Sequence, residues 1–174
     1  MNSVRAASVQ FNHKHGDKSH NLARITEFAE AAVTNEVDLL VFPEMCITGY
    51  WGVRKMSQPE IEALAEPIPG GPSSQALLAL AAKYGMTIGA GLIEQDAAGD
   101  LYNAYVAAMP DGRVAVHRKL HTFISKYMKS GNSFTVADTP HGVRIGILIC
   151  YDVNIIENVR ITEFAEAAVT NEVD

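Results

Sequence analysis

The chain has 174 residues, 48% of them hydrophobic and 20% charged, and its formal net charge is −6. This length suits one domain with a hydrophobic core, and the composition is typical of a soluble globular protein. The acidic balance, with no cluster of lysine and arginine, argues against a nucleic-acid partner. No apolar run approaches the roughly 20 residues that cross a bilayer, so no membrane partner is expected either.

Cysteine and histidine usage narrows the setting and the chemistry. Two cysteines, Cys46 and Cys150, do not make a disulfide framework, and the N-terminal residues lack the pattern of a signal peptide. A reducing, cytoplasmic location is therefore expected. The six histidines are scattered without a metal-binding spacing, so we predict neither a metal site nor a cofactor.

Apolar runs of strand length alternate with helical patterns along the chain. Strands are predicted over residues 4–10, 39–42, 87–94, 103–109, 114–119 and 143–149. Helices are predicted over residues 21–35, 59–65 and 73–84, with Ser73 or Ser74 capping the last and Gly85 ending it. Hairpin turns are predicted over 96–100 and 110–112, and a long irregular loop over 119–132. This order indicates an α/β protein with layered, mixed sheets.

Three of the predicted strands end at a group suited to catalysis. Glu44 follows the run 39–42, Lys119 ends the run 114–119, and Cys150 ends the run 143–149. A carboxylate can take the proton of a thiol, and an ammonium can stabilise a thiolate and an oxyanion. Each residue also has a common structural explanation, because cysteine often packs in cores and glutamate and lysine usually lie at surfaces. Cys46 has no comparable setting and is interpreted as a packing residue.

The motifs around these residues resemble the nitrilase, or carbon–nitrogen hydrolase, superfamily. The resemblance rests on Phe42-Pro43-Glu44, His117-Arg118-Lys119-Leu120-His121 and Leu148-Ile149-Cys150-Tyr151-Asp152, in that order. It covers about residues 4 to 160 and implies an α-β-β-α sandwich with mixed sheets, usually assembled as a homo-oligomer. Residues 1–160 are accordingly predicted to form the nitrilase-like catalytic domain.

The resemblance also implies roles for the three residues. Glu44 matches the general base, Lys119 the oxyanion-stabilising lysine and Cys150 the nucleophile, with the backbone N–H of Tyr151 as a second oxyanion donor. The implied reaction is hydrolysis of a small amide or N-carbamoyl compound through a thioester, with nitriles still open as substrates. No metal or cofactor is required. Tyr50 and Trp51 either line the substrate pocket or cap the edge of the sandwich, and Asn103 either contacts the substrate or closes a turn.

Two features depart from the family pattern. Lys126 aligns with a glutamate that many members carry, so a second positive charge near Lys119 is expected. The last fifteen residues, 160–174, repeat residues 24–38 letter for letter. Such identity indicates a recent duplication, a recombination joint or an error in assembling the sequence, and not an ancient repeat.

The repeat leads to a prediction about the end of the fold. Residues 161–174 are expected to form a second copy of the helix 25–38, not an independent domain, with Phe164, Ala165, Ala168 and Val169 as its buried stripe. The strands that follow in the family are not present, so the fold is expected to be incomplete at its C-terminus. The alternative function is therefore a truncated, inactive nitrilase-like protein that self-associates through its open apolar surface. A regulatory module that binds a ligand without chemistry is a third option.

Overall fold

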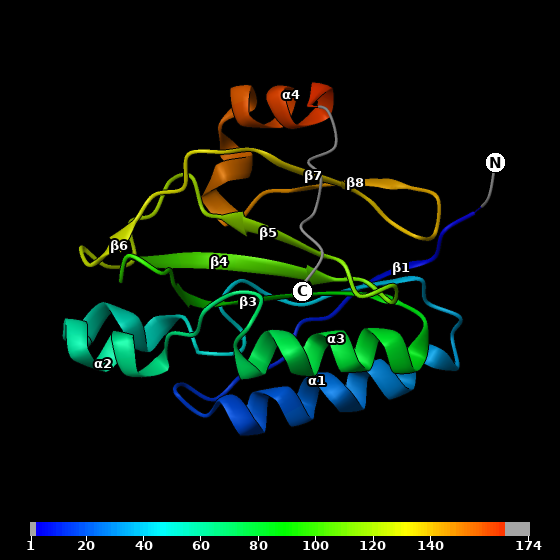
Figure 1. Ribbon diagram of the computed structural model, residues 1–174, viewed down its shortest axis with the longest axis horizontal. Coiled ribbons are helices and arrows are strands. Elements are labelled where there is room, and N and C mark those ends of the chain that lie inside the picture. Colours follow the sequence, from blue (N-terminus) through cyan, green and yellow to red (C-terminus); the bar gives the residue numbers. More distant parts are fainter. Residues whose placement is uncertain (1–2, 166–174) are drawn as a thin grey trace.

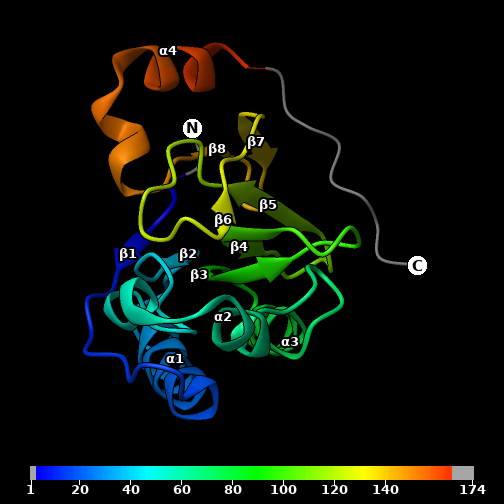
Figure 2. The same cartoon turned by 90° about the vertical axis from the view of Figure 1, so that its left-hand side faces the viewer.

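The computed structural model describes residues 3–165, which fold into four layers (Figure 1). Helices α1 (Lys18–Val33) and α3 (Pro72–Tyr84) cover one face of a six-stranded sheet. A two-stranded sheet lies over the opposite face, and α4 (Ile156–Phe164) covers that second sheet (Figure 2). The predicted α-β-β-α layering is therefore confirmed.

The six-stranded sheet is mixed, as the sequence predicts. Strands β1 (Ala6–Ser8), β2 (Leu39–Val41) and β3 (Thr87–Gln95) are parallel, and β4 (Leu101–Ala108) and β5 (Val114–Arg118) continue the sheet antiparallel. The short strand β6 (Met128–Lys129) pairs with the start of β4. The predicted hairpin turns connect β3 to β4 and β4 to β5.

The second sheet consists of an antiparallel hairpin, β7 (Thr135–Asp138) and β8 (Arg144–Ile147). Of these strands, only β8 shows in the sequence as a continuous apolar run. Strand β7 begins with threonine and ends with aspartate, so it carries too few apolar residues to be predicted. A 3₁₀ turn, η2 (Cys150–Asn154), joins the second sheet to α4.

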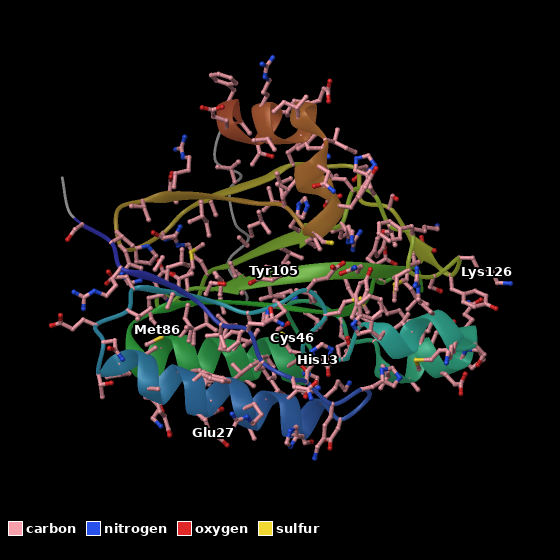
Figure 3. The ribbon with its side chains drawn as sticks, turned by 180° about the vertical axis from the view of Figure 1, so that it is seen from behind. His13, Glu27, Cys46, Met86, Tyr105 and Lys126 are labelled. Atoms are coloured by element: carbon pink, nitrogen blue, oxygen red, sulfur yellow. The ribbon has the colours of Figure 1, made fainter. Side chains whose placement is uncertain are left out.

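The largest hydrophobic cluster lies between the helices α1 and α3 and the six-stranded sheet. Ile25, Ala29 and Ala32 of α1 are buried in this cluster, and Phe28 is partly buried against it. Val33, which the same helical spacing predicts to be buried, is instead 44% exposed. Figure 3 shows Cys46 and Met86 in this interior, and both side chains are buried members of the cluster. Burial raises the pKa of the Cys46 thiol to about 12, so this cysteine packs as an inert apolar residue.

The start of α3 corrects one prediction. Gly71 is the N-cap, and neither Ser73 nor Ser74 caps the helix. Instead, the carboxylate of Glu66 accepts hydrogen bonds from the Ser73 backbone N–H at 2.7 Å and from the Ser73 hydroxyl at 2.9 Å. Lys18 at the start of α1 lies 2.6 Å from the same carboxylate, so Glu66 ties together the first turns of two helices. The short helix α2 (Gln58–Leu64) precedes Glu66 in the chain.

The repeated segment adopts a different environment in its second copy. Helix α4 ends at Phe164, and the Phe164 side chain is 81% exposed, so its predicted place in a buried stripe is wrong. The predicted stripe residues Ala168 and Val169 lie outside the described residues. The buried residues of α4 are instead Asn158 and Thr162. The Thr162 methyl group packs so closely against Gly146 of β8 that a side chain on Gly146 would collide with it. Among residues 3–165, no helix is both long enough and apolar enough to span a membrane.

Candidate active site

Three strand ends bring Glu44, Lys119 and Cys150 together. Lys119 Nζ lies 2.6 Å from Glu44 Oε1, although the two residues are 75 positions apart in the sequence. The Glu44 carboxylate acts on the Cys150 thiol both through its charge and as a hydrogen-bond partner. The structure therefore places the three predicted residues within reach of one another.

The turn that carries Glu44 depends on an unusual backbone. Met45, directly after Glu44, has a φ of 48°, which lies in the left-handed region that most residues avoid. A Cβ atom on Gly91 of β3 would come within 2.2 Å of the Met45 nitrogen, so only glycine allows this close approach. The Gly91 carbonyl also accepts a hydrogen bond from the Ile47 backbone N–H, which fixes the turn against β3.

Lys119 is a buried cation with a defined position. Its side chain is 1% exposed, and its backbone N–H donates to the Asn103 carbonyl while its own carbonyl accepts from the Gly131 N–H. A buried ammonium needs an anionic partner, and Glu44 provides it. The ammonium also lies 4.9 Å from the centre of the Phe123 ring, whose face stabilises a positive charge.

Cys150 sits at the first position of η2 and is exposed. Its φ of 51° places it in the left-handed region, so the chain turns sharply where the thiol is presented. Burial of the sulfur and the Glu44 charge raise the pKa of this thiol, while Lys119 and the backbone N–H of Tyr151 oppose that rise. The thiol is therefore protonated at neutral pH, with a carboxylate beside it that can accept the proton.

The further candidate residues Asn103, Tyr50 and Trp51 differ in how deeply they are buried. Asn103, on β4, is fully buried and donates from Nδ2 to Glu44 Oε1 at 2.6 Å. Tyr50, at the N-terminus of the 3₁₀ turn η1 (Trp51–Lys55), has a raised pKa because of burial and then the charges of Glu44 and Cys150. The Trp51 ring stands edge-on to the Tyr50 ring at 5.2 Å and is 71% exposed.

Tyr151 contributes its backbone to the thiol and its ring to the surface. The backbone N–H bonds to the Cys150 sulfur, and the ring meets Phe123 edge-on at 5.7 Å. Together, Phe123 and Tyr151 form an exposed aromatic pair beside the thiol.

Lys126 does not enter the site as expected. Its side chain is exposed at the outer edge of the molecule (Figure 3), and its ammonium lies 5.1 Å from the Tyr127 ring centre. The expected second charge is thus directed to the surface, and Lys119 keeps its short contact with Glu44.

The sequence interpretation missed Asp152, a fully buried carboxylate two residues after Cys150. Its place inside the nucleophile motif was the available signal, but an aspartate after a strand is usually a solvated residue. Within the part of the chain that the structure describes, no three His, Cys, Asp or Glu side chains are grouped so that they could hold a metal ion.

Comparison with known proteins shows which family the chain belongs to. The sequence profile described as carbon-nitrogen hydrolase matches residues 5–171, and the chain belongs to that family. It is 34% identical over 154 residues to an (R)-stereoselective amidase of Pseudomonas sp, covering 87% of this chain and 53% of the relative. It is also 34% identical over 169 residues to the Homo sapiens omega-amidase NIT2, covering 90% of this chain and 58% of that protein.

Solved structures show the same fold. Saccharomyces cerevisiae Nit3, described as a member of branch 10 of the nitrilase superfamily, superposes with a TM-score of 0.78 at 29% identity, over 91% of this chain and 59% of Nit3. A carbon-nitrogen hydrolase of Helicobacter pylori G27 gives a TM-score of 0.79 at 25% identity, over 91% of this chain and 55% of that protein. The chain thus spans a little over half the length of the relatives it matches.

Proposed function

We propose that this protein hydrolyses a non-peptide carbon–nitrogen bond in a small amide or N-carbamoyl compound, with Cys150 as the nucleophile. The observation that carries the proposal is the Glu44 carboxylate, held at 2.6 Å by Lys119 and acting directly on the Cys150 thiol. Family membership and the two amidase relatives support a C–N bond as the target.

The first half of the proposed reaction forms a thioester. Glu44 removes the thiol proton as the Cys150 sulfur attacks the carbonyl carbon, and negative charge moves to the carbonyl oxygen. Lys119 and the Tyr151 backbone N–H stabilise that oxyanion, and one such donor typically lowers the barrier by roughly 3–4 kcal/mol. Protonated Glu44 then gives its proton to the nitrogen, the C–N bond breaks, and ammonia or an amine leaves.

The second half releases the acid and restores the enzyme. Glu44 takes a proton from water, which attacks the thioester carbon, and the C–S bond breaks as the thiolate regains the proton from Glu44. Asn103 and Lys119 both donate to Oε1 of Glu44, so the second carboxylate oxygen is the one that meets the thiol or the water. The raised pKa of the thiol fits this scheme, because it requires a base at each turnover and not a stored thiolate.

The test is ammonia release from a panel of primary amides, N-carbamoyl compounds and nitriles, with intact-mass detection of the acyl adduct. We expect Cys150→Ala to abolish both signals and Cys46→Ala to retain them, because Cys46 is buried in the hydrophobic core and burial raises the pKa of its thiol to about 12. Ammonia release that persists in Cys150→Ala, or a complete absence of both signals in the unaltered chain, would overturn the proposal.

A second candidate function is self-association without turnover. It is favoured by four exposed apolar side chains on η2 and α4, namely Val153, Ile156, Ile161 and Phe164. Contiguous exposed apolar side chains mark association surfaces more often than ordinary solvent-facing helices. A stable monomer with measurable turnover would exclude this candidate, whereas association together with turnover would indicate a homo-oligomeric enzyme.

A further inference from the structure

Asp152 is a buried carboxylate to which the proposed reaction gives no task. It lies in η2, two residues after Cys150, and none of its surface is exposed. Removing a carboxylate from water is costly unless hydrogen bonds replace the lost hydration. The donors that replace it here come from both sides of the active site.

Three backbone N–H groups converge on the Asp152 carboxylate. Ile149 donates to Oδ2 at 3.2 Å, Leu120 donates to the same oxygen at 3.2 Å, and His121 donates to Oδ1 at 2.9 Å. Ile149 directly precedes Cys150, and Leu120 directly follows Lys119. One side chain therefore joins the strand end that carries the nucleophile to the strand end that carries the catalytic ammonium.

Further contacts reach Asp152 from the surrounding elements. His117 of β5, also fully buried, places Nε2 at 3.6 Å from Asp152 Oδ2, and its Nδ1 lies 3.1 Å from the Thr135 hydroxyl of β7. The Asp152 main-chain carbonyl accepts a hydrogen bond from the Asn158 side chain of α4 at 3.1 Å. Strands of both sheets and the outer helix thus meet at this residue.

We propose that Asp152 is a positioning residue that holds the Cys150 turn against the Lys119 strand end. This inference rests on the proposed function, because it states that Asp152 sets the distance between the proposed nucleophile, Cys150, and the ammonium of Lys119. It has a clear physical basis in the Cys150 backbone, whose φ of 51° is unfavourable for a non-glycine residue. Such a turn persists only where its surroundings hold it, and the bond from Ile149 to Asp152 lies directly beside it.

The test measures how strongly Glu44 influences the Cys150 thiol, using iodoacetamide as the probe. The pH at which alkylation is half-maximal is determined for the unaltered chain and for Glu44→Gln, and the difference reports their coupling. The same pair is then measured in an Asp152→Asn background. Asparagine keeps the shape of the side chain but has one acceptor oxygen in place of two, so at least one of the three N–H groups loses its partner.

We expect the difference caused by Glu44→Gln to fall to less than about half of its value in the Asp152→Asn background. If the panel of amides yields turnover, Asp152→Asn is expected to lower kcat by about 100-fold and leave KM within about threefold, as for a misplaced catalytic group. The alkylation measurement does not require turnover. Failure of the proposed hydrolysis and failure of this inference are therefore distinguishable.

The matched control is Glu66→Gln, which alters another buried carboxylate that accepts a backbone N–H but lies outside the site. In this control background, Glu44→Gln is expected to shift the alkylation midpoint by the same amount as in the unaltered chain. Should Asp152→Asn not fold, Asp152→Glu keeps the charge and both acceptor oxygens but lengthens the link by one methylene, and the same loss of coupling is expected. A folded Asp152 variant with full coupling would overturn the inference.

Discussion

The protonation state of one thiol decides how this site can work. Cys150 is an exposed residue, yet partial burial of its sulfur and then the adjacent Glu44 charge hold the pKa of its thiol above the ordinary value. The single ammonium of Lys119 lowers the thiol pKa but does not reverse the shift. In the proposed reaction, the neutral Cys150 thiol therefore needs a base to remove its proton before the sulfur attacks.

Because Glu44 both raises the thiol pKa and is the proposed base, replacing it should speed alkylation of Cys150 but slow turnover. Glu44→Gln removes the negative charge that raises the Cys150 pKa, so the midpoint of iodoacetamide alkylation should move to lower pH. At pH 8.5 the variant should thus be alkylated faster than the unaltered chain. Turnover should nevertheless fall by roughly 100- to 10,000-fold, because the general base is lost.

Two controls bracket the alkylation measurement. Lys119→Met should move the midpoint to higher pH, because it removes a charge that lowers the thiol pKa. Cys150→Ala reports any background from Cys46, which should be negligible because the Cys46 pKa is about 12. An unchanged or higher midpoint in Glu44→Gln would show that the carboxylate does not control the thiol.

At the scale of elements, the repeated segment separates what local sequence determines from what packing determines. Residues Arg160 to Phe164 are helical in α4, as residues Arg24 to Phe28 are in α1. The buried face nevertheless differs, since Ile25 is fully buried and Ile161 is 47% exposed. In α4 the buried face is formed by Asn158, which bonds to the Asp152 carbonyl, and by Thr162 one turn later.

The same contrast predicts that replacing phenylalanine with alanine lowers the free energy of unfolding more in α1 than in α4. The Phe28 ring packs against Phe11 at 5.9 Å and Phe42 at 6.2 Å, whereas Phe164 is 81% exposed. Phe28→Ala should therefore lower the free energy of unfolding by about 2–4 kcal/mol, and Phe164→Ala should change it by less than about 0.5 kcal/mol. Urea unfolding of the two variants provides the measurement, and equal costs would contradict the assigned packing.

These elements also show how far the sequence alone leads. Periodicity was sufficient for α1, α3 and strands β1 to β5, because each has a buried stripe or an apolar run of its own, whereas β6 lies in the segment 119–132 that was predicted to be an irregular loop. It missed β7 and Asp152, whose positions depend on partners distant in the chain, such as Val116 for Thr135 and Leu120 for Asp152. Motif order identified the three candidate catalytic residues, but the link between Asn103 and Glu44 required the pairing of β4 beside β3.

At the scale of the whole molecule, the two outer helical layers differ in how much apolar surface they bury against the sheets they cover. Helices α1 and α3 bury apolar stripes against the six-stranded sheet and against each other. Helix α4 contacts the small second sheet through Thr162 and directs Ile156, Ile161 and Phe164 away from it. The outer face of α4 therefore exposes apolar side chains, whereas α1 and α3 bury theirs, and we propose it as the surface for contact with a second copy.

Association through this face should depend on concentration and on two side chains. The double variant Ile161→Ser, Phe164→Ser is expected to shift the mass measured by light scattering after size-exclusion chromatography from an assembled species to the monomer, because burial of these side chains drives the contact. Val33→Ser offers the matched control, since Val33 is an exposed apolar residue on α1, at the opposite outer layer. That variant should retain the original mass. Equal effects of the two changes would show that association, if present, uses another surface, and an unaltered chain that remains monomeric at every concentration would contradict self-association altogether.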